Sequence, residues 1–178
     1  MKQLFHVFIL LSLTVTSGWA QTVEQALEPH FGMQGGPVFR LTTIGGSSAV
    51  MMGNQNASRF GRITIGGTGF ALINTDSLDV PVSMGYGGPT IGYTNRIAGP
   101  LLYITQIMIG GGGMQAGHVS TGAFVGEVDA TLCLDILPFM RLTAGAGYRL
   151  VAGTDLPTYS DSDFSGANLS FGMMFGSF

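Results

Sequence analysis

The stretch Gly122–Gly153, GAFVGEVDATLCLDILPFMRLTAGAGYRLVAG, decides the fold because its chemistry alternates over almost its whole length. The even-numbered positions from Phe124 to Leu150 are mostly apolar or aromatic, whereas the odd-numbered positions from Glu127 to Arg149 are mostly polar, charged or small. Successive side chains of a strand point to opposite faces, so the pattern predicts two strands that share one greasy face and one polar face.

The charges in this stretch predict how the two strands pair. If the turn is centred on Pro138, then Asp135 lies opposite Arg141 and Glu127 lies opposite Arg149. Opposed charges of opposite sign favour strand pairing by roughly 0.2–1 kcal/mol each. On a solvated sheet face this match would be a coincidence, whereas inside a barrel the pairs would satisfy one another. A slip of one residue would move every charge to the greasy face.

The composition indicates a membrane protein that does not cross by helices. The 178 residues, enough for one domain, are 46% hydrophobic and only 10% charged, against about 25% charged in soluble domains. The sequence after the leader lacks an apolar run of about 18 residues, which a spanning helix requires. A closed β-barrel is the other structure that pairs every backbone polar group within lipid.

The first segments of the chain predict export. Residues 1–20 combine Lys2, the apolar run VFILLSLTV and the small residues Gly18 and Ala20, which is typical of a signal peptide cleaved before Gln21. A short N-terminal anchor helix is the alternative. The mature chain then has six arginines and ten acidic residues, a net charge of −4, which argues against a nucleic-acid partner. We expect residues 21–36 to form a periplasmic stub and residues 37–178 to form the barrel.

The barrel is predicted to be an eight-stranded, antiparallel, up-and-down barrel of the outer-membrane type. The strands are expected at 38–43, 47–53, 60–73, 79–94, 101–114, on both sides of Pro138, and at 165–178. The segment NQNAS (54–58) is interpreted as a polar loop, and residues 154–164 as a long, exposed acidic loop. The apolar positions change parity at Gly87-Gly88-Pro89, so a β-bulge is expected there.

An eight-stranded barrel has an interior that side chains can fill, so we expect a polar plug and no open pore. The residues assigned to this structural interior network are Arg62, Glu127, Asp129, Asp135, Arg141 and Arg149.

No pattern in the sequence points to a catalytic, cofactor or metal site. Glu127 and Asp129 lie two residues apart, but the arginines predicted to face them favour a structural network over paired acid catalysis. His118 and Ser120 could join an acid in a membrane-embedded lipid enzyme. Cys133 is the only cysteine, so an intrachain disulfide is excluded.

Several glycine-rich stretches resemble a family of small, uncharacterised exported outer-membrane-type β-barrel proteins of Bacteroidetes-type bacteria. They are IGGTGFALIN (65–74), VSMGYGGPTIGY (82–93), IMIGGGG (107–113), the acidic alternating strand near Glu127, GAGYRLVAG (145–153) and SDSDFSGANLSFGMMFGSF (160–178). The resemblance implies an outer-membrane β protein and brings no activity or functional residue with it. The family usually ends in a basic tail of the FKFGKF type, whereas this chain ends in MMFGSF.

The terminal Phe178 also resembles the signal that outer-membrane barrels present to their insertion machinery. It departs from that signal because Leu169, Phe171, Met173 and Phe175 share one face and Phe178 has the opposite parity.

The main hypothesis is a monomeric outer-membrane barrel without catalysis, with a structural role or a surface ligand held by its loops, chiefly the loop around Tyr159. Its expected partners are outer-membrane lipid and the barrel-insertion machinery. The first alternative is a soluble periplasmic or secreted barrel whose greasy face points inward around an apolar ligand. The second is the lipid enzyme that would use His118 and Ser120.

Overall fold

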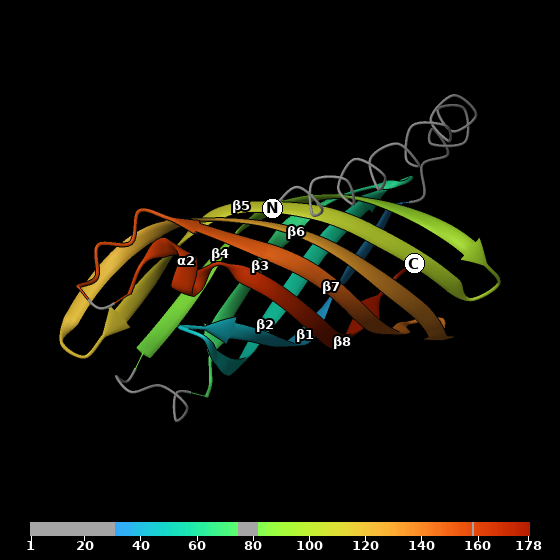
Figure 1. Cartoon of the computed structure of the whole chain (residues 1–178). Coiled ribbons are helices and arrows are strands. Elements are labelled where there is room, and N and C mark those ends of the chain that lie inside the picture. The colour runs from blue at the N-terminus through green and yellow to red at the C-terminus, as the bar shows by residue number, and fades with distance from the viewer. Residues whose placement is uncertain (1–30, 75–81, 158) are drawn as a thin grey trace, which may run out of the picture.

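The computed structural model describes residues 31–74, 82–157 and 159–178, which form a closed antiparallel β-barrel (Figure 1). Each strand pairs with the next one in sequence, and β8 pairs with β1 to close the barrel. The expected signal peptide (1–20) and the stub up to residue 30 lie outside the described residues. The strands are β1 (Phe31–Ile44), β2 (Ser47–Phe60), β3 (Ile63–Leu72), β4 (Val82–Ala98), β5 (Leu101–Ala116), β6 (Val119–Leu137), β7 (Met140–Ala152) and β8 (Gly166–Gly176).

The predicted fold class is confirmed, but several strands extend beyond the bounds expected for them. β1 begins at Phe31, so residues 31–36 belong to the barrel and not to the stub. NQNAS lies within β2, where Gln55 and Ala57 are buried and Asn54 and Asn56 are exposed. Polar residues on both faces of this segment concealed its alternation. β6 begins at Val119, directly after the turn Gly117-His118 that follows β5.

The predicted register of the Pro138 hairpin is confirmed, because Glu127 pairs with Arg149 and Asp135 pairs with Arg141. The bulge expected at Gly87-Gly88-Pro89 is wrong. The β3–β4 pairing runs through these residues without a shift, and the irregularity in β4 lies between Arg96 and Ala98.

The reason for the wrong bulge is a change in the chemistry of the barrel interior. The even-numbered residues of β4 face inward throughout, from Val82 and Met84 to Thr90 and Thr94, while Ile91 faces outward. The inner face is therefore apolar at one end of the strand and polar at the other, with no change of parity.

The outer face of the barrel is apolar on all eight strands. Exposed large hydrophobic side chains include Phe39, Met52, Ile65, Ile91, Ile107, Val128, Leu150 and Phe171. Among the described residues, no helix is long and apolar enough to cross a membrane. The greasy even-numbered face of the Pro138 hairpin is thus the outside of the barrel.

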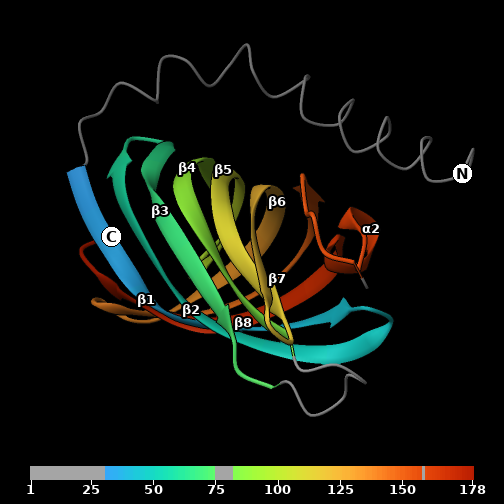
Figure 2. The ribbon, with the colours of Figure 1, turned by 90° about the vertical axis from the view of Figure 1, so that its left-hand side faces the viewer.

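The two ends of the barrel differ. At the terminal end, where β1 begins and β8 ends, two-residue turns (Gly61-Arg62, Gly99-Pro100 and Pro138-Phe139) join the strands. At the loop end, Gly45 and Gly46 form a tight turn with φ values of 56° and 80°, which favour glycine. The loop end also carries the 153–165 connection with the short helix α2 (Asp161–Phe164), and Figure 2 views the barrel from this side.

Candidate functional site in the barrel interior

A cluster of buried charges crosses the middle of the barrel, and Arg40 of β1 is its centre. The Arg40 side chain is 3% exposed; it forms an ion pair with Glu127 and a second one with Asp129, at 3.1 Å between Nη2 and Oδ2. Arg40 also donates a hydrogen bond to the Tyr86 hydroxyl at 2.9 Å, and that hydroxyl donates to Glu127 at 3.1 Å. This central cluster thus joins β1, β4 and β6, which the sequence separates widely.

Arg149 lies beside the central cluster, but its closest hydrogen bonds go to neutral groups. Its Nε donates to the carbonyl of Phe164 at 2.8 Å, and its Nη1 donates to the Met51 sulfur at 3.1 Å. Its Nη2 donates a longer hydrogen bond to the Thr42 hydroxyl, at 3.4 Å. Although Arg149 faces Glu127 in the register, no ion pair joins them, because Arg40 contacts that carboxylate from across the barrel. Through its hydrogen bond to the Phe164 carbonyl, Arg149 instead links β7 to α2.

A second charged cluster lies at the terminal end. Asp135 forms ion pairs with Arg141 and with Arg96, the latter at 3.0 Å. Arg141 also donates to the Gln34 side chain at 3.0 Å, and the ring of Phe178 lies 3.6 Å from its guanidinium carbon. This contact accounts for the unexpected parity of Phe178, whose ring stacks on Arg141 and does not continue the outer face of β8.

The interior toward the loop end is apolar, which differs from the expected polar plug. Four buried methionines lie there with aromatic and branched side chains, and the main members are Ile44, Met51, Phe70, Val82, Met84, Met108, Met114, Val125, Val151 and Phe164. Outward-facing residues of the same strands are also apolar. Hydrophobic pattern alone therefore could not distinguish the inner face from the outer face in this half.

The 153–165 connection closes the loop end and is not a freely exposed loop. Phe164 is fully buried, Leu156 is 8% exposed, and Tyr159 packs on Phe164 with ring centroids 5.7 Å apart. We call this segment the cap. Its base is held by Asp161, which accepts hydrogen bonds from the Thr154 amide at 2.7 Å and the Gly153 amide at 3.1 Å.

The hydrogen bonds within the cap also set its acid–base behaviour. The Thr154 hydroxyl, the Thr154 amide and the Gly153 amide lower the pKa of Asp161 below its ordinary value. The amide and hydroxyl of Ser160 lower the pKa of Asp163 in the same way. Both carboxylates are therefore stabilised in their charged form by the folded cap.

The structure places five of the six predicted network residues on the inner face and separates them into two clusters. Glu127, Asp129 and Arg149 lie in or beside the central cluster, and Asp135 and Arg141 lie at the terminal end. Arg62, the sixth, lies in the β2–β3 turn and donates to the Tyr93 hydroxyl at 3.1 Å. It was expected within the strand at 60–73, but β3 begins only after it, at Ile63.

Sequence reasoning missed Arg40 and Tyr86, the two residues that organise the central cluster. A signal for Arg40 was present, because Arg40 and Thr42 alternate with the greasy Phe39 and Leu41. No local signal identified Tyr86 as interior, since aromatic residues also occupy the outer face.

The residues weighed for catalysis lie away from the interior. His118 and Ser120 are both exposed at the loop end. Within the described ranges, no group of three His, Cys, Asp or Glu side chains could hold a metal ion. Cys133 is free and buried beside Leu102, Ile104 and Met174.

Comparisons with known proteins identify the fold. No protein-family model matches the sequence, and no curated protein matches it significantly. Neisserial surface protein A (NspA) superposes with a TM-score of 0.65 at 12% identity, over 82% of this chain and 96% of that chain. Ail, the attachment invasion locus protein of Yersinia pestis, gives a TM-score of 0.54 at 13% identity, over 82% and 97%. Ail in complex with the heparin analogue sucrose octasulfate gives 0.51. The chain has the fold of eight-stranded outer-membrane barrels.

Proposed function

We propose that this protein is a small, monomeric outer-membrane β-barrel that presents its loop end to surface partners and carries no catalytic activity. The apolar outer face is the observation that supports this proposal most directly. Residues such as Val128 and Leu150 are 47% and 61% exposed, and every strand contributes others like them. In water this belt would be a very large apolar patch, whereas in a bilayer it would face lipid.

The same observation weighs against the soluble alternative. A barrel that binds an apolar ligand inside would need the greasy face of the Pro138 hairpin to point inward, but Val128, Leu132 and Leu150 point outward. The inward positions hold Glu127 and Arg149. Glu127 accepts a hydrogen bond from the Tyr86 hydroxyl, and Arg149 donates one to the Phe164 carbonyl. No contact in the described residues favours the lipid enzyme over a binding role.

The surface role is supported by the difference between the two ends of the barrel. The cap is a folded structure with three carboxylates, Asp155, Asp161 and Asp163, whereas two-residue turns join the described strands at the terminal end. Long loops of outer-membrane barrels face the outside of the cell. The names of the similar proteins, a surface protein and an attachment protein, agree with such a role. Because the cap is acidic, we expect it to repel a polyanion such as sucrose octasulfate and to favour a basic or neutral partner.

The membrane location is tested by fractionation and by comparing heated and unheated samples on an SDS gel. Recovery in the outer membrane with a heat-dependent mobility shift is expected. Val128→Arg, near the middle of β6, should destabilise the barrel by about 2–4 kcal/mol in lipid vesicles. The control Ser162→Arg places the same charge on the exposed cap and should have little effect. Equal stability of the two variants, or recovery of the protein in the soluble periplasm, would contradict the proposal.

Orientation is tested with two single cysteines that differ only in the end of the barrel they occupy. Ser162→Cys lies on the cap and Ala98→Cys lies at the terminal end, and both positions are exposed. Cys133 is fully buried and should stay unlabelled. A membrane-impermeant maleimide on intact cells should label Ser162→Cys alone. Labelling of Ala98→Cys alone would place the cap in the periplasm and remove the surface role.

The proposal includes export by the predicted signal peptide, insertion by the barrel machinery and an origin in Bacteroidetes-type bacteria. N-terminal sequencing of the mature protein tests the first of these, with Gln21 as the expected first residue.

A further inference from the structure

Arg141 is buried although it lies at the end of a strand. It is the second residue of β7 at the terminal end, yet its side chain is only 1% exposed. Its partner Asp135 is 22% exposed, and Arg96, the other partner of Asp135, is 52% exposed. The long side chain of an arginine at the rim of a barrel can reach water. Another group must therefore cover Arg141.

The C-terminal residue Phe178 provides this cover. Its ring lies 3.6 Å from the guanidinium carbon of Arg141, a distance typical of a cation–π contact. Phe178 is itself partly exposed, whereas the guanidinium group beneath it is not. The ring thus lies between Arg141 and the solvent at the terminal end of the barrel.

Hydrogen bonds to two neighbouring segments place the chain end in this position. The Gly176 amide donates to the Phe139 carbonyl at 3.1 Å, and the Ser177 amide donates to the Met33 carbonyl at 3.0 Å. The Ser177 hydroxyl accepts a bond from the Met33 amide at 3.2 Å. A side chain at position 176 would not fit, because its Cβ would lie 1.9 Å from the Met33 carbonyl oxygen. We call Gly176–Phe178 the C-terminal latch.

A layer of apolar side chains lies directly behind the pair of Arg141 and Asp135. Cys133 is the next inward residue of β6 beyond Asp135, and it is fully buried. It packs in one cluster with Leu102, Ile104 and Met174. Cys133 is also the only cysteine of the chain. Its thiol therefore reports on water that enters the interior from the terminal end.

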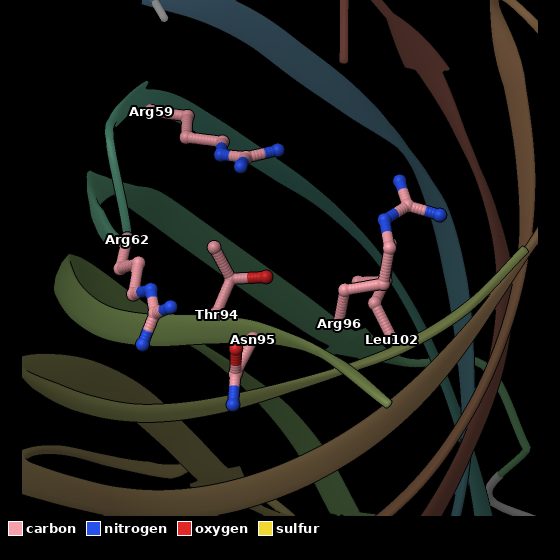
Figure 3. Close-up of a pocket in the computed structure, with 6 residues that line it drawn as sticks. All are labelled: Arg59, Arg62, Thr94, Asn95, Arg96 and Leu102. Carbon is pink, nitrogen blue, oxygen red and sulfur yellow. The ribbon is translucent and has the colours of Figure 1, made fainter. Parts of the chain in front are cut away.

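A cavity of about 190 Å³ at the terminal end reaches as far as this layer. Figure 3 shows the Arg59 and Arg96 side chains extending into the same opening, with Leu102 beside Arg96. Leu102 lines the cavity and is the strand partner of both Arg96 and Cys133. A small molecule in the cavity would thus be separated from Cys133 by one side chain.

We propose that the C-terminal latch seals the terminal end of the barrel interior, and that it opens locally to admit water to the layer around Cys133. Opening breaks the contact of Phe178 with Arg141 and the hydrogen bonds of Gly176 and Ser177, while the strand pairing of β8 stays intact. A chain end held by a few bonds opens more readily than paired strands do. The inference does not depend on the proposed membrane location.

The test measures how fast Cys133 reacts in the full mature chain, folded in a neutral detergent. A small, water-soluble methanethiosulfonate is added, and intact mass spectrometry follows the modified fraction with time. Phe178→Ala removes the ring, Phe178→Leu keeps an apolar side chain that cannot stack, and Phe178→Tyr keeps the ring. Phe175→Ala is the matched control, because it removes an outward-facing ring from the same strand end. The heat-dependent gel shift shows that each variant is folded, and Cys133→Ser confirms the site of modification.

We expect Phe178→Ala to raise the rate of Cys133 modification about tenfold over the wild type. Phe178→Leu should raise it less, and Phe178→Tyr and Phe175→Ala should leave it unchanged. A wild-type rate in Phe178→Ala would show that the latch does not control access to the interior. An equal increase in Phe178→Ala and Phe175→Ala would assign access to the stability of the whole barrel. Either of these two results would overturn the proposal.

Discussion

The loop-end and terminal-end halves of the barrel interior are enclosed by the same strands with the same alternation, yet they are filled differently. The loop-end half is packed with methionine, phenylalanine and branched side chains under the cap. The rest of the interior holds two ion-paired clusters, one around Arg40 and one around Asp135. The strand pattern therefore fixes which residues face inward but not what kind of interaction fills the space.

The two kinds of interior should respond differently to substitution. A buried ion pair contributes little net stability, but removing one partner leaves an uncompensated charge and is strongly destabilising. An apolar core loses stability in proportion to the cavity that remains, and flexible neighbours can reduce that cavity. The comparison can therefore be tested by one substitution in each half.

The largest effect is expected from Arg40→Leu. This change leaves Glu127 and Asp129 buried without their cation, so we expect a loss of about 3–5 kcal/mol of unfolding free energy. Urea unfolding of the refolded barrel in lipid vesicles measures it. Arg149→Leu should cost clearly less, because its closest partners are a carbonyl and a sulfur.

The combined variant Arg40→Leu with Glu127→Gln and Asp129→Asn is the control for this prediction. If the loss comes from unpaired carboxylates, neutralising both should restore much of the stability. An Arg40→Leu barrel as stable as the wild type would mean that the central cluster has no energetic role.

A smaller effect is expected in the apolar half from Met108→Ala. Met108 is fully buried, and its loss should cost about 2 kcal/mol, the lower end of the range for such truncations. The neighbouring methionines can move into part of the space. The same urea experiment measures the change, and Met108→Leu, which nearly conserves volume, should cost less than about 1.5 kcal/mol. A loss in Met108→Ala as large as that of Arg40→Leu would remove the distinction between the halves.

The difference between the halves also explains what the sequence could predict. In the Pro138 hairpin the odd-numbered positions are charged, so alternation and charge pairing together gave the correct register. In β4 the inner residues Val82 and Met84 are as apolar as the outer residue Ile91. Hydrophobicity cannot tell an inner apolar residue from an outer one, and this ambiguity produced the wrong bulge.

The interior contacts were harder to predict, because they cross the barrel. Arg40 and Glu127 are 87 residues apart, and only closure of β1 on β8 brings their strands to one enclosed space. The hairpin register places Arg149 opposite Glu127, but the ion pair of the Glu127 carboxylate is formed with Arg40 of β1. The cap could not be predicted for a related reason. Leu156 and Phe164 are isolated apolar residues in a polar segment, and they are buried because the cap packs on the apolar half of the interior.

The smallest effect concerns pH and acts only on the cap of the apolar half. Because hydrogen bonds from Thr154 and Gly153 lower the pKa of Asp161 in the folded cap, the charged form stabilises that fold. This contribution is present above the ordinary carboxyl pKa of about 4 and is lost as the pH falls through the lower, folded value. We expect the Gly153 and Thr154 amide resonances to shift below pH 4 in NMR spectra of the micelle-bound barrel. Asp161→Asn should remove the titration at Gly153 and Thr154, and an unchanged titration in that variant would assign it to another group. If the amide resonances of the whole barrel were lost together at that pH, the cap would not respond to pH independently of the barrel.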